Sequence, residues 1–176
     1  MSFKMCAIRV LALLCLAGCW QDVPPDRVFK SAGRDVEVYS SFEKIAMREK
    51  FARIIPSGAT DIWITWGGGI GGQDVDFRCR ISLDDLLSFA KERGYKFEEF
   101  DMNDNAMHGF GFCLRNPESA IFAHFPLVVD AEVLGHHSDG FLGFSANDEQ
   151  KKRVDADWLK YVYDVKFGVL WGMWYN

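Results

Sequence analysis

The sequence holds one compact group of side chains that could bind a metal ion or transfer a proton. His136, His137 and Asp139 lie close together in the chain. Imidazole and carboxylate groups are ordinary zinc ligands, and histidine titrates near neutral pH. Neighbouring residues of a strand point in opposite directions, however, and no two histidines have the His-x-His or the i, i+4 spacing. We expect a solvated loop here, whose residues are the candidates if the chain has a metal or acid–base site.

A glycine pattern superficially indicates nucleotide binding. Gly67, Gly69 and Gly72 fit the G-x-G-x-x-G spacing of dinucleotide-binding loops. Such a loop must lead into a helix, because the first backbone N–H groups of that helix hold the pyrophosphate. The residues after Gly72 instead alternate between polar and apolar types, which is typical of a strand. The glycines therefore predict a hairpin loop, and we expect no cofactor.

The two cysteines that follow the N-terminal segment form a candidate disulfide. Cys79 and Cys113 would meet oxidising conditions if the chain is exported. Cys79 lies on the apolar face of its predicted strand, whereas Cys113 shares a face with Gly111 and Arg115. A bridge and two separately buried thiols both stay open at this point. Because no G-x-S-x-G nucleophile motif is present, the sequence favours a protein that is not an enzyme.

The N-terminus resembles a bacterial lipoprotein signal peptide. Lys4 and Arg9 accompany a short apolar run that ends in Leu16-Ala17-Gly18-Cys19. These four residues resemble a lipobox, which implies cleavage before Cys19, a diacylglycerol on its thiol and acylation, typically with palmitate, of the new N-terminus. A membrane-spanning helix would need about 20 apolar residues, more than this run contains. We therefore expect a signal peptide over residues 1–18 and a lipid anchor on Cys19.

The resemblance also implies a location in the bacterial cell envelope. Trp20 rather than Asp follows Cys19, which in the enteric sorting pattern permits transfer to the periplasmic face of the outer membrane. Loss of Lys4 and Arg9 with the signal changes the formal net charge from −5 to −7. An acidic chain is a poor partner for nucleic acid or anionic lipid head groups. The lipid is then the expected membrane contact, and an envelope protein or a glycan the expected partner.

The mature chain predicts a tether and one domain. Residues 19–35 are polar and contain two adjacent prolines, which is typical of a flexible tether, and residues 36–176 are long enough for a single core. Apolar residues at helical spacing predict a helix over residues 41–55. A second helix is predicted over residues 83–93, with Ser82 as N-cap and Gly94 as stop. Its expected buried stripe is Leu83, Leu86, Leu87, Phe89 and Ala90.

Strands are predicted where polar and apolar residues alternate or aromatic and β-branched residues gather. These segments are 61–66, 73–81, 110–114, 119–129, 140–144, 158–163 and 169–175. Together they predict an α+β fold, a mainly antiparallel sheet with two helices packed on one face. The mature part is similar to small secreted or lipid-anchored bacterial proteins in which a helix runs into an Ile/Leu-Pro-x-x-Ala-x-x-Ile segment, here residues 55–62. That resemblance implies no activity.

Large aromatic residues are more numerous than a core of this size requires. The predicted C-terminal hairpin carries Trp158, Trp171 and Trp174. Strand alternation should turn Trp171 and Trp174 in opposite directions, so that one is core and the other surface. Exposed rings rarely persist without a role, and we therefore expect a partner surface at these tryptophans, with an all-core arrangement as the alternative.

The sequence thus favours a lipid-anchored cell-envelope protein that acts as a binding or assembly module. The alternative is a small hydrolase or metal-dependent enzyme centred on the loop of His136, His137 and Asp139. An enzyme should place these residues beside acidic groups in a cleft, whereas a binding module should show an aromatic patch without one.

Overall fold

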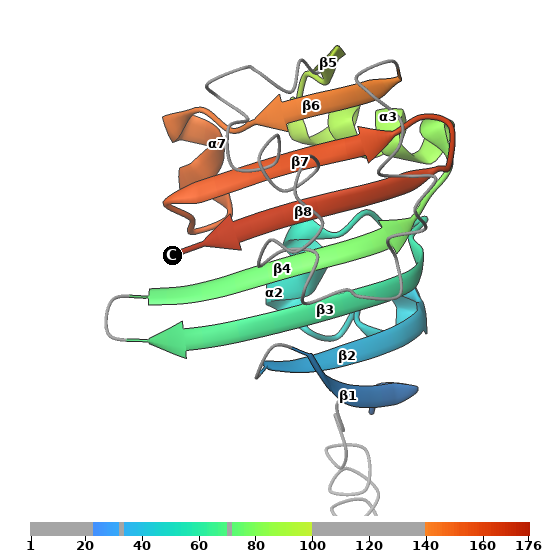
Figure 1. The fold of residues 1–176 in the computed structure, drawn as a ribbon. Helices are drawn as coiled ribbons and strands as arrows, with labels where there is room; N and C mark the ends of the chain where they lie inside the picture. The colour runs from blue at the N-terminus through green and yellow to red at the C-terminus, as the bar shows by residue number, and fades with distance from the viewer. Residues whose placement is uncertain (1–22, 32–33, 70–71, 100–139) are drawn as a thin grey trace, which may run out of the picture.

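The computed structural model describes residues 23–31, 34–69, 72–99 and 140–176, which form one antiparallel sheet of eight strands (Figure 1). The strands are β1 (Arg27–Ser31), β2 (Arg34–Ser41), β3 (Thr60–Gly69), β4 (Gly72–Arg80), β5 (Glu98–Glu99), β6 (Phe141–Ser145), β7 (Trp158–Asp164) and β8 (Val169–Tyr175). Their order in the sheet is β1-β2-β3-β4-β8-β7-β6-β5, and every neighbouring pair is antiparallel. The predicted α+β class with a mainly antiparallel sheet is confirmed.

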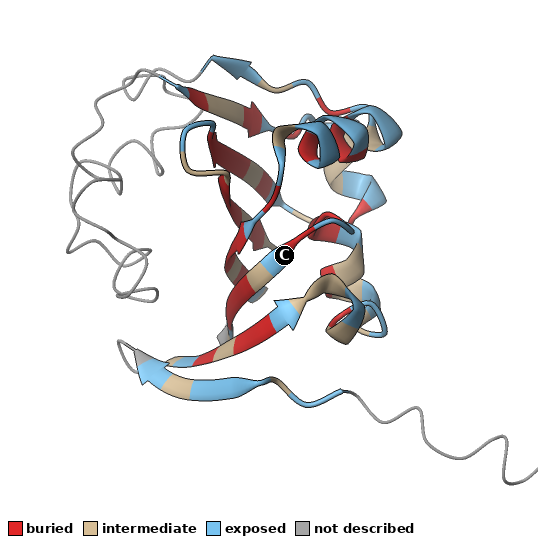
Figure 2. Ribbon diagram, turned by 90° about the vertical axis from the view of Figure 1, so that its right-hand side faces the viewer, coloured by how far each residue is buried: buried red, intermediate tan, exposed pale blue. Residues whose placement is uncertain are grey.

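The described residues form three α-helices rather than the two predicted. They are α2 (Glu49–Ile54), α3 (Leu83–Arg93) and α7 (Asp148–Arg153), and a short 3-10 turn, η1 (Phe42–Lys44), precedes α2. Figure 2 shows the helical ribbons on one side of the sheet. We call this side the helix face.

Helix α3 begins and ends where its capping residues predict. The Ser82 hydroxyl accepts a hydrogen bond from the backbone N–H of Asp85 (3.1 Å), and Gly94 leaves the helix at φ 68°. The predicted stripe is buried or half-buried except for Leu87, which is 48% exposed. Consecutive residues lie about 100° apart around a helix, so Leu87 turns away from the core that Leu86 enters.

The helix predicted over residues 41–55 is interrupted. The chain forms η1, leaves helical conformation at Arg48 (φ −87°, ψ 89°) and resumes as the six-residue α2. The Arg48 guanidinium donates to Glu37 and lies 5.6 Å above the centre of the Tyr39 ring. These contacts with β2 outweigh the local preference for helix, which is a weak influence at single residues.

Helix α7 lies between the predicted strands 140–144 and 158–163, where no helix was predicted. The Asn147 side chain accepts from the backbone N–H of Gln150, and the Gln150 side chain accepts from the backbone N–H of Asn147 (both 3.0 Å). This reciprocal capping box is a helix start signal in the sequence, in its Asn-x-x-Gln form.

The first strands begin inside the segment expected to be a tether. Residues 27–31 and 34–35 belong to β1 and β2. The Arg27 guanidinium lies 5.2 Å above the Trp63 ring, and the Phe29 ring meets that indole edge-on at 5.5 Å. Because Trp63 is remote in sequence, the polar composition of the segment gives no sign of this packing.

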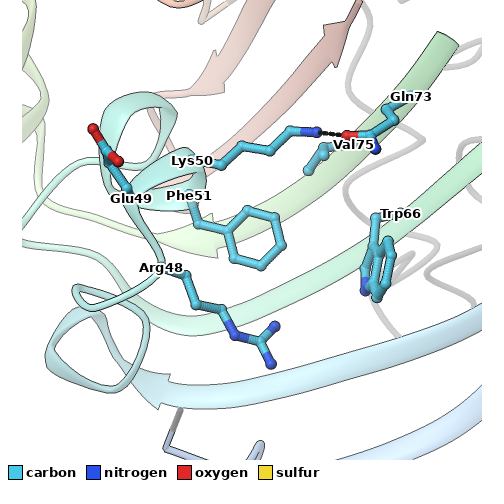
Figure 3. A pocket seen from close by; sticks show the side chains of 7 residues that line it. All are labelled: Arg48, Glu49, Lys50, Phe51, Trp66, Gln73 and Val75. Atoms are coloured by element: carbon cyan, nitrogen blue, oxygen red, sulfur yellow. Dashed lines mark hydrogen bonds between the residues drawn. The ribbon is translucent and has the colours of Figure 1, made fainter. Parts of the chain in front are cut away.

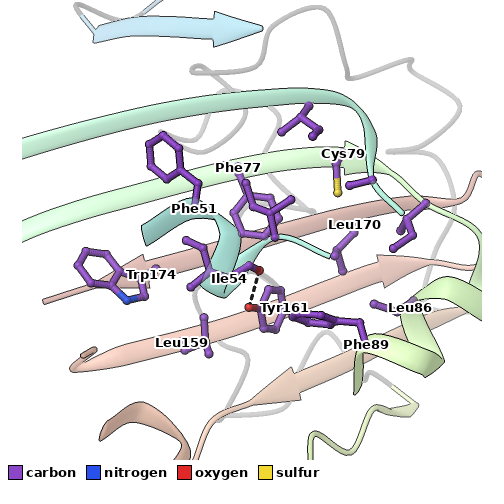
Figure 4. Packing of buried hydrophobic residues seen from close by; sticks show 14 of the residues in the cluster. Phe51, Ile54, Phe77, Cys79, Leu86, Phe89, Leu159, Tyr161, Leu170 and Trp174 are labelled. Carbon is purple, nitrogen blue, oxygen red and sulfur yellow. Dashed lines mark hydrogen bonds between the residues drawn. The ribbon is translucent and has the colours of Figure 1, made fainter. Parts of the chain in front are cut away.

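The core lies between the helices and the helix face of the sheet (Figure 4). Tyr161 on β7 is its centre: the ring packs against Phe77 (6.0 Å between ring centres), and the hydroxyl donates to the backbone carbonyl of Ile54 (2.7 Å). Gly172 on β8 pairs with both Phe77 and Tyr161 in the sheet register. A Cβ atom at Gly172 would overlap the Phe77 ring, so only glycine leaves room for it.

Candidate functional site

A groove of about 380 Å³ lies on the helix face, where the β3–β4 hairpin passes α2 (Figure 3). We call it the Trp66 groove; its lining residues are Arg48, Glu49, Lys50, Phe51, Trp66, Gln73 and Val75. Its volume is within the range of small-ligand sites, roughly 300 to 1,000 Å³. Apolar side chains from helix and strands therefore meet several polar groups in a space that a ligand could occupy.

Trp66 is the exposed aromatic wall of this groove. It pairs with the buried Val75 across the hairpin, yet its own side chain is 55% exposed. The next residues of β3 are glycines, which have no side chain to cover the indole. A large apolar ring is thus held at the surface by a regular strand rather than by a loop.

Helix α2 supplies the opposite wall. Phe51 and Ile54 are buried and hold the helix on the sheet. The Tyr161 hydroxyl satisfies the Ile54 carbonyl, one of the acceptors that a helix C-terminus leaves unpaired. These tertiary anchors fix a helix that is too short to be stable alone, and so fix Arg48 and Lys50 beside the groove.

The Lys50 ammonium group is held between two partners. Its Nζ donates to Oε1 of Gln73 (2.7 Å; Figure 3). The same atom lies 3.7 Å from the centre of the Trp174 ring. Burial lowers the pKa of Lys50, while the carboxylates of Asp155 and Asp74 act in the opposite direction. No ion pair joins Lys50 to a carboxylate in the part of the chain that the structure describes.

A second hollow of about 220 Å³ adjoins the first. It shares Glu49, Lys50 and Gln73 with the groove, and its other lining residues are Arg53, Val154, Asp155, Trp174 and Asn176. Backbone hydrogen bonds in both directions join Gln73 to Asn176 (2.6 and 2.9 Å), which fixes the strand that carries the Gln73 amide. The Lys50 ammonium therefore stands where the two hollows meet.

The other cation of the groove is engaged in an ion pair. Nη1 of Arg48 donates to Oε2 of Glu37 (2.6 Å), which also accepts from the Tyr39 hydroxyl (2.6 Å). Burial, and then the Glu37 carboxylate, raise the pKa of Tyr39. The Arg48 guanidinium also lies 5.5 Å above the Phe51 ring. Its charge is compensated, and its main effect is to fix the wall.

The opposite face of the sheet carries a separate polar group. Asp61 sits in a bulge of β3 at φ 46°, a conformation that aspartate tolerates better than most residues. Its carboxylate accepts from Nε1 of Trp63 (2.8 Å) and Nη1 of the buried Arg78 (3.1 Å). The Arg78 charge is thus matched by Asp61, and the pair stabilises the bulge. On the same face of β4, burial, and then the Asp74 carboxylate, raise the pKa of Asp76 to about 7.

Most of the chemically reactive residues chosen from the sequence lie outside the described residues. This is so for Cys19, Cys113, His136, His137 and Asp139. The described residues contain no group of three His, Cys, Asp or Glu side chains able to hold a metal ion. Cys79 is buried on the helix face and has no disulfide partner among the described residues, and burial raises the pKa of its thiol. Its pairing with Cys113 stays a prediction.

The glycine hairpin is confirmed. Gly67 and Gly69 lie in β3, Gly72 begins β4, and the strands remain paired as far as Gly69 and Gly72. A strand rather than a helix follows the glycines.

The three tryptophans of the predicted partner surface differ in their burial. Trp171 and Trp174 face opposite ways, as predicted, but both are buried, so the expectation that one of them is surface is wrong. On the helix face, Nε1 of Trp174 donates to the carbonyl of Val154 at the end of α7 (3.0 Å). The unpredicted α7 and the Lys50 side chain explain why Trp174 is covered. Trp158 is 55% exposed, and its role in a partner surface stays a prediction.

Sequence reasoning therefore missed Lys50, Gln73 and the groove itself. One signal was present: Trp66 directly precedes three glycines, a context in which an indole has no neighbours to cover it. Lys50 gave none, because its contacts with Gln73 and Trp174 join segments far apart in the chain.

Comparison of the chain with protein-family models, curated proteins and solved structures gives no match in any of the three. Among the described helices, none has both the length and the apolar character needed to cross a membrane. The geometry of the chain is therefore the basis for assigning a function.

Proposed function

We propose that the protein is a lipid-anchored module of the bacterial cell envelope that binds a ligand in the Trp66 groove. The observation that carries this proposal is an indole that is 55% exposed, beside a cation without a carboxylate partner among the described residues. Trp is enriched at binding hot spots because its large rigid surface gains much from being covered. The site is placed here rather than on the C-terminal hairpin, since Trp171 and Trp174 are buried.

The groove is organised before any ligand arrives. Phe51 and Val75 are buried parts of the core, and hydrogen bonds fix Lys50 and the backbone of Gln73. Binding then orders few side chains, which keeps the entropic cost of association low. No described residue favours the enzymatic alternative, whose histidines and aspartate lie outside the described chain.

Lipidation of Cys19 would hold the domain near the bilayer. β1 begins at Arg27, so only seven residues, or eight steps between Cα atoms, separate the sheet from the anchor. A fully extended chain of that length spans at most about 29 Å. A ligand of the groove is therefore expected within the envelope layer next to the membrane.

Anchoring is tested by Cys19→Ser in the full-length chain. We expect an uncleaved precursor that takes up no radiolabelled palmitate, because the lipidated thiol is gone. Labelling of the variant would contradict the lipoprotein assignment.

The binding site is tested by photo-crosslinking. A benzophenone amino acid at position 66, in the full-length chain in its native envelope, should yield a discrete adduct. The same group at position 158 is the matched control, because the two tryptophans are equally exposed. An adduct from position 158 alone, or from neither position, would contradict the proposal.

A further inference from the structure

We infer that the Trp66 groove recognises a sugar ring that carries a carboxylate. This inference rests on the proposed function and specifies its ligand. The charges that line the groove support the acidic group, and the arrangement of aromatic and amide side chains supports the sugar.

Of the three charged residues that line the groove, only Lys50 has no ion pair in the part of the chain that the structure describes. Arg48 is paired with Glu37, and Glu49 is paired with Arg53. The carboxylates of Asp155 and Asp74 act on the Lys50 charge without forming an ion pair, and in Figure 3 the Glu49 side chain points away from Lys50. A single negative charge on the ligand matches this arrangement, whereas a phosphate ester approaches a charge of about −2 and is bound best by arginine forks or rows of backbone N–H groups.

The Lys50 ammonium has hydrogen-bond donors available for a carboxylate. A lysine ammonium has three N–H donors, and Gln73 accepts from one of them. The aromatic face of Trp174 holds the group in place from one side. Donors remain for the two oxygens of a carboxylate, and the partly buried site strengthens a charge-assisted hydrogen bond relative to water.

The rest of the groove suits a sugar ring. A pyranose has apolar C–H faces and a rim of hydroxyl groups. The exposed Trp66 ring offers a flat surface for the C–H groups, and the Gln73 amide, on the neighbouring strand, lies on the same side of the groove and can bond to hydroxyl groups (Figure 3). Asn176, which has a second side-chain amide, is among the residues that line the adjoining hollow. A chain of sugars could therefore pass over Lys50 from one hollow into the other.

The test compares two probes that differ only in charge. A trisaccharide that contains one hexuronic acid unit, and the methyl ester of that unit, are titrated into the full-length chain in detergent, and tryptophan fluorescence and heat are recorded. We expect the acid to bind about tenfold to a hundredfold more tightly than the ester, the range for a hydrogen bond to a charged group. Equal affinities would overturn the inference.

Substitutions at Lys50 and Trp66 assign the effect to the groove. Lys50→Met should make the acid and the ester bind alike, and Lys50→Arg should keep the preference for the acid. Trp66→Ala should weaken both probes, while Trp158→Ala, the equally exposed control, should change neither. A preference that survives Lys50→Met would overturn the inference.

A third probe separates this inference from the proposed function. An N-acetylated tripeptide with a C-terminal carboxylate and an aromatic side chain has the same single negative charge but no sugar. Tighter binding of the tripeptide than of the uronic acid would overturn the sugar assignment. If crosslinking from position 66 succeeds and the acid shows no advantage over the ester, the ligand class is wrong and the binding site stands; if both fail, both proposals are wrong.

Discussion

Replacing Gly172 by alanine tests how tightly the sheet packs under α2. Gly172 on β8 lies between Phe77 and Tyr161, and an added Cβ would overlap two ring carbons of Phe77 and lie 3.0 Å from a third, Cδ1. The ring cannot simply move aside, because Phe77 is fully buried and packs against Tyr161, whose hydroxyl is bonded to Ile54. Overpacking of a well-filled core typically costs about 1 to 3 kcal/mol, and we expect the upper part of this range.

The physical cause is tested by a double-mutant cycle. Phe77→Leu removes the ring atoms that the new methyl group would meet, at the cost of a cavity. In this background Gly172→Ala should cost at least about 1 kcal/mol less than in the wild-type chain, because contacting residues are not additive. The free energy of unfolding is measured by urea titration with circular dichroism. Equal costs of Gly172→Ala in both backgrounds would refute the packing argument.

Three further predictions concern single side chains. Burial raises the pKa of the Asp76 carboxyl from 3.8 to about 7, so on raising the pH the unfolded chain loses the carboxyl proton before the folded chain does. The free energy of unfolding should therefore fall by roughly 2 kcal/mol between about pH 5 and pH 8. Asp76→Asn should remove this fall in urea titrations at the two pH values. Tyr161→Phe should cost about 1 to 3 kcal/mol, because it leaves the carbonyl of Ile54 buried without its donor. It should also weaken binding of the trisaccharide that contains the hexuronic acid in the same calorimetric titration. Unchanged stability would show that the bond is not needed. Ser82→Ala should cost about 1 kcal/mol of stability, because the N-cap of α3 is lost. Leu86→Asp should cost several times more, because it buries a charge in the core. Similar small losses from the two variants in thermal unfolding would contradict the packing of α3.

The sequence predicts an element well where local chemistry determines it. Helix α3 has its cap, its stripe and its stop within residues 82–94, and the β7–β8 hairpin has clear aromatic runs around a turn. Helix α7 was also predictable, since Asn147 and Gln150 form a capping box. Helix α7 itself contains no apolar residue, so it lacks the hydrophobic pattern by which the other helices were predicted.

Elements that depend on distant partners were not predictable in this way. The break before α2 depends on Arg48 meeting Glu37 and Tyr39, and β1 depends on Trp63. The candidate site follows the same rule: Trp66 could be found beside its glycines, but the role of Lys50 arises from contacts that only the folded chain creates.

The central claim is that ligand binds at the Trp66 groove and not at the C-terminal hairpin. Hydrogen–deuterium exchange of the full-length chain, with and without the glycan fraction of the envelope, tests this claim directly. We predict slower exchange in peptides covering residues 48–53 and 66–75, with no change around Trp158 at the start of β7. Protection confined to β7, or no protection in either segment of the groove, would contradict the account.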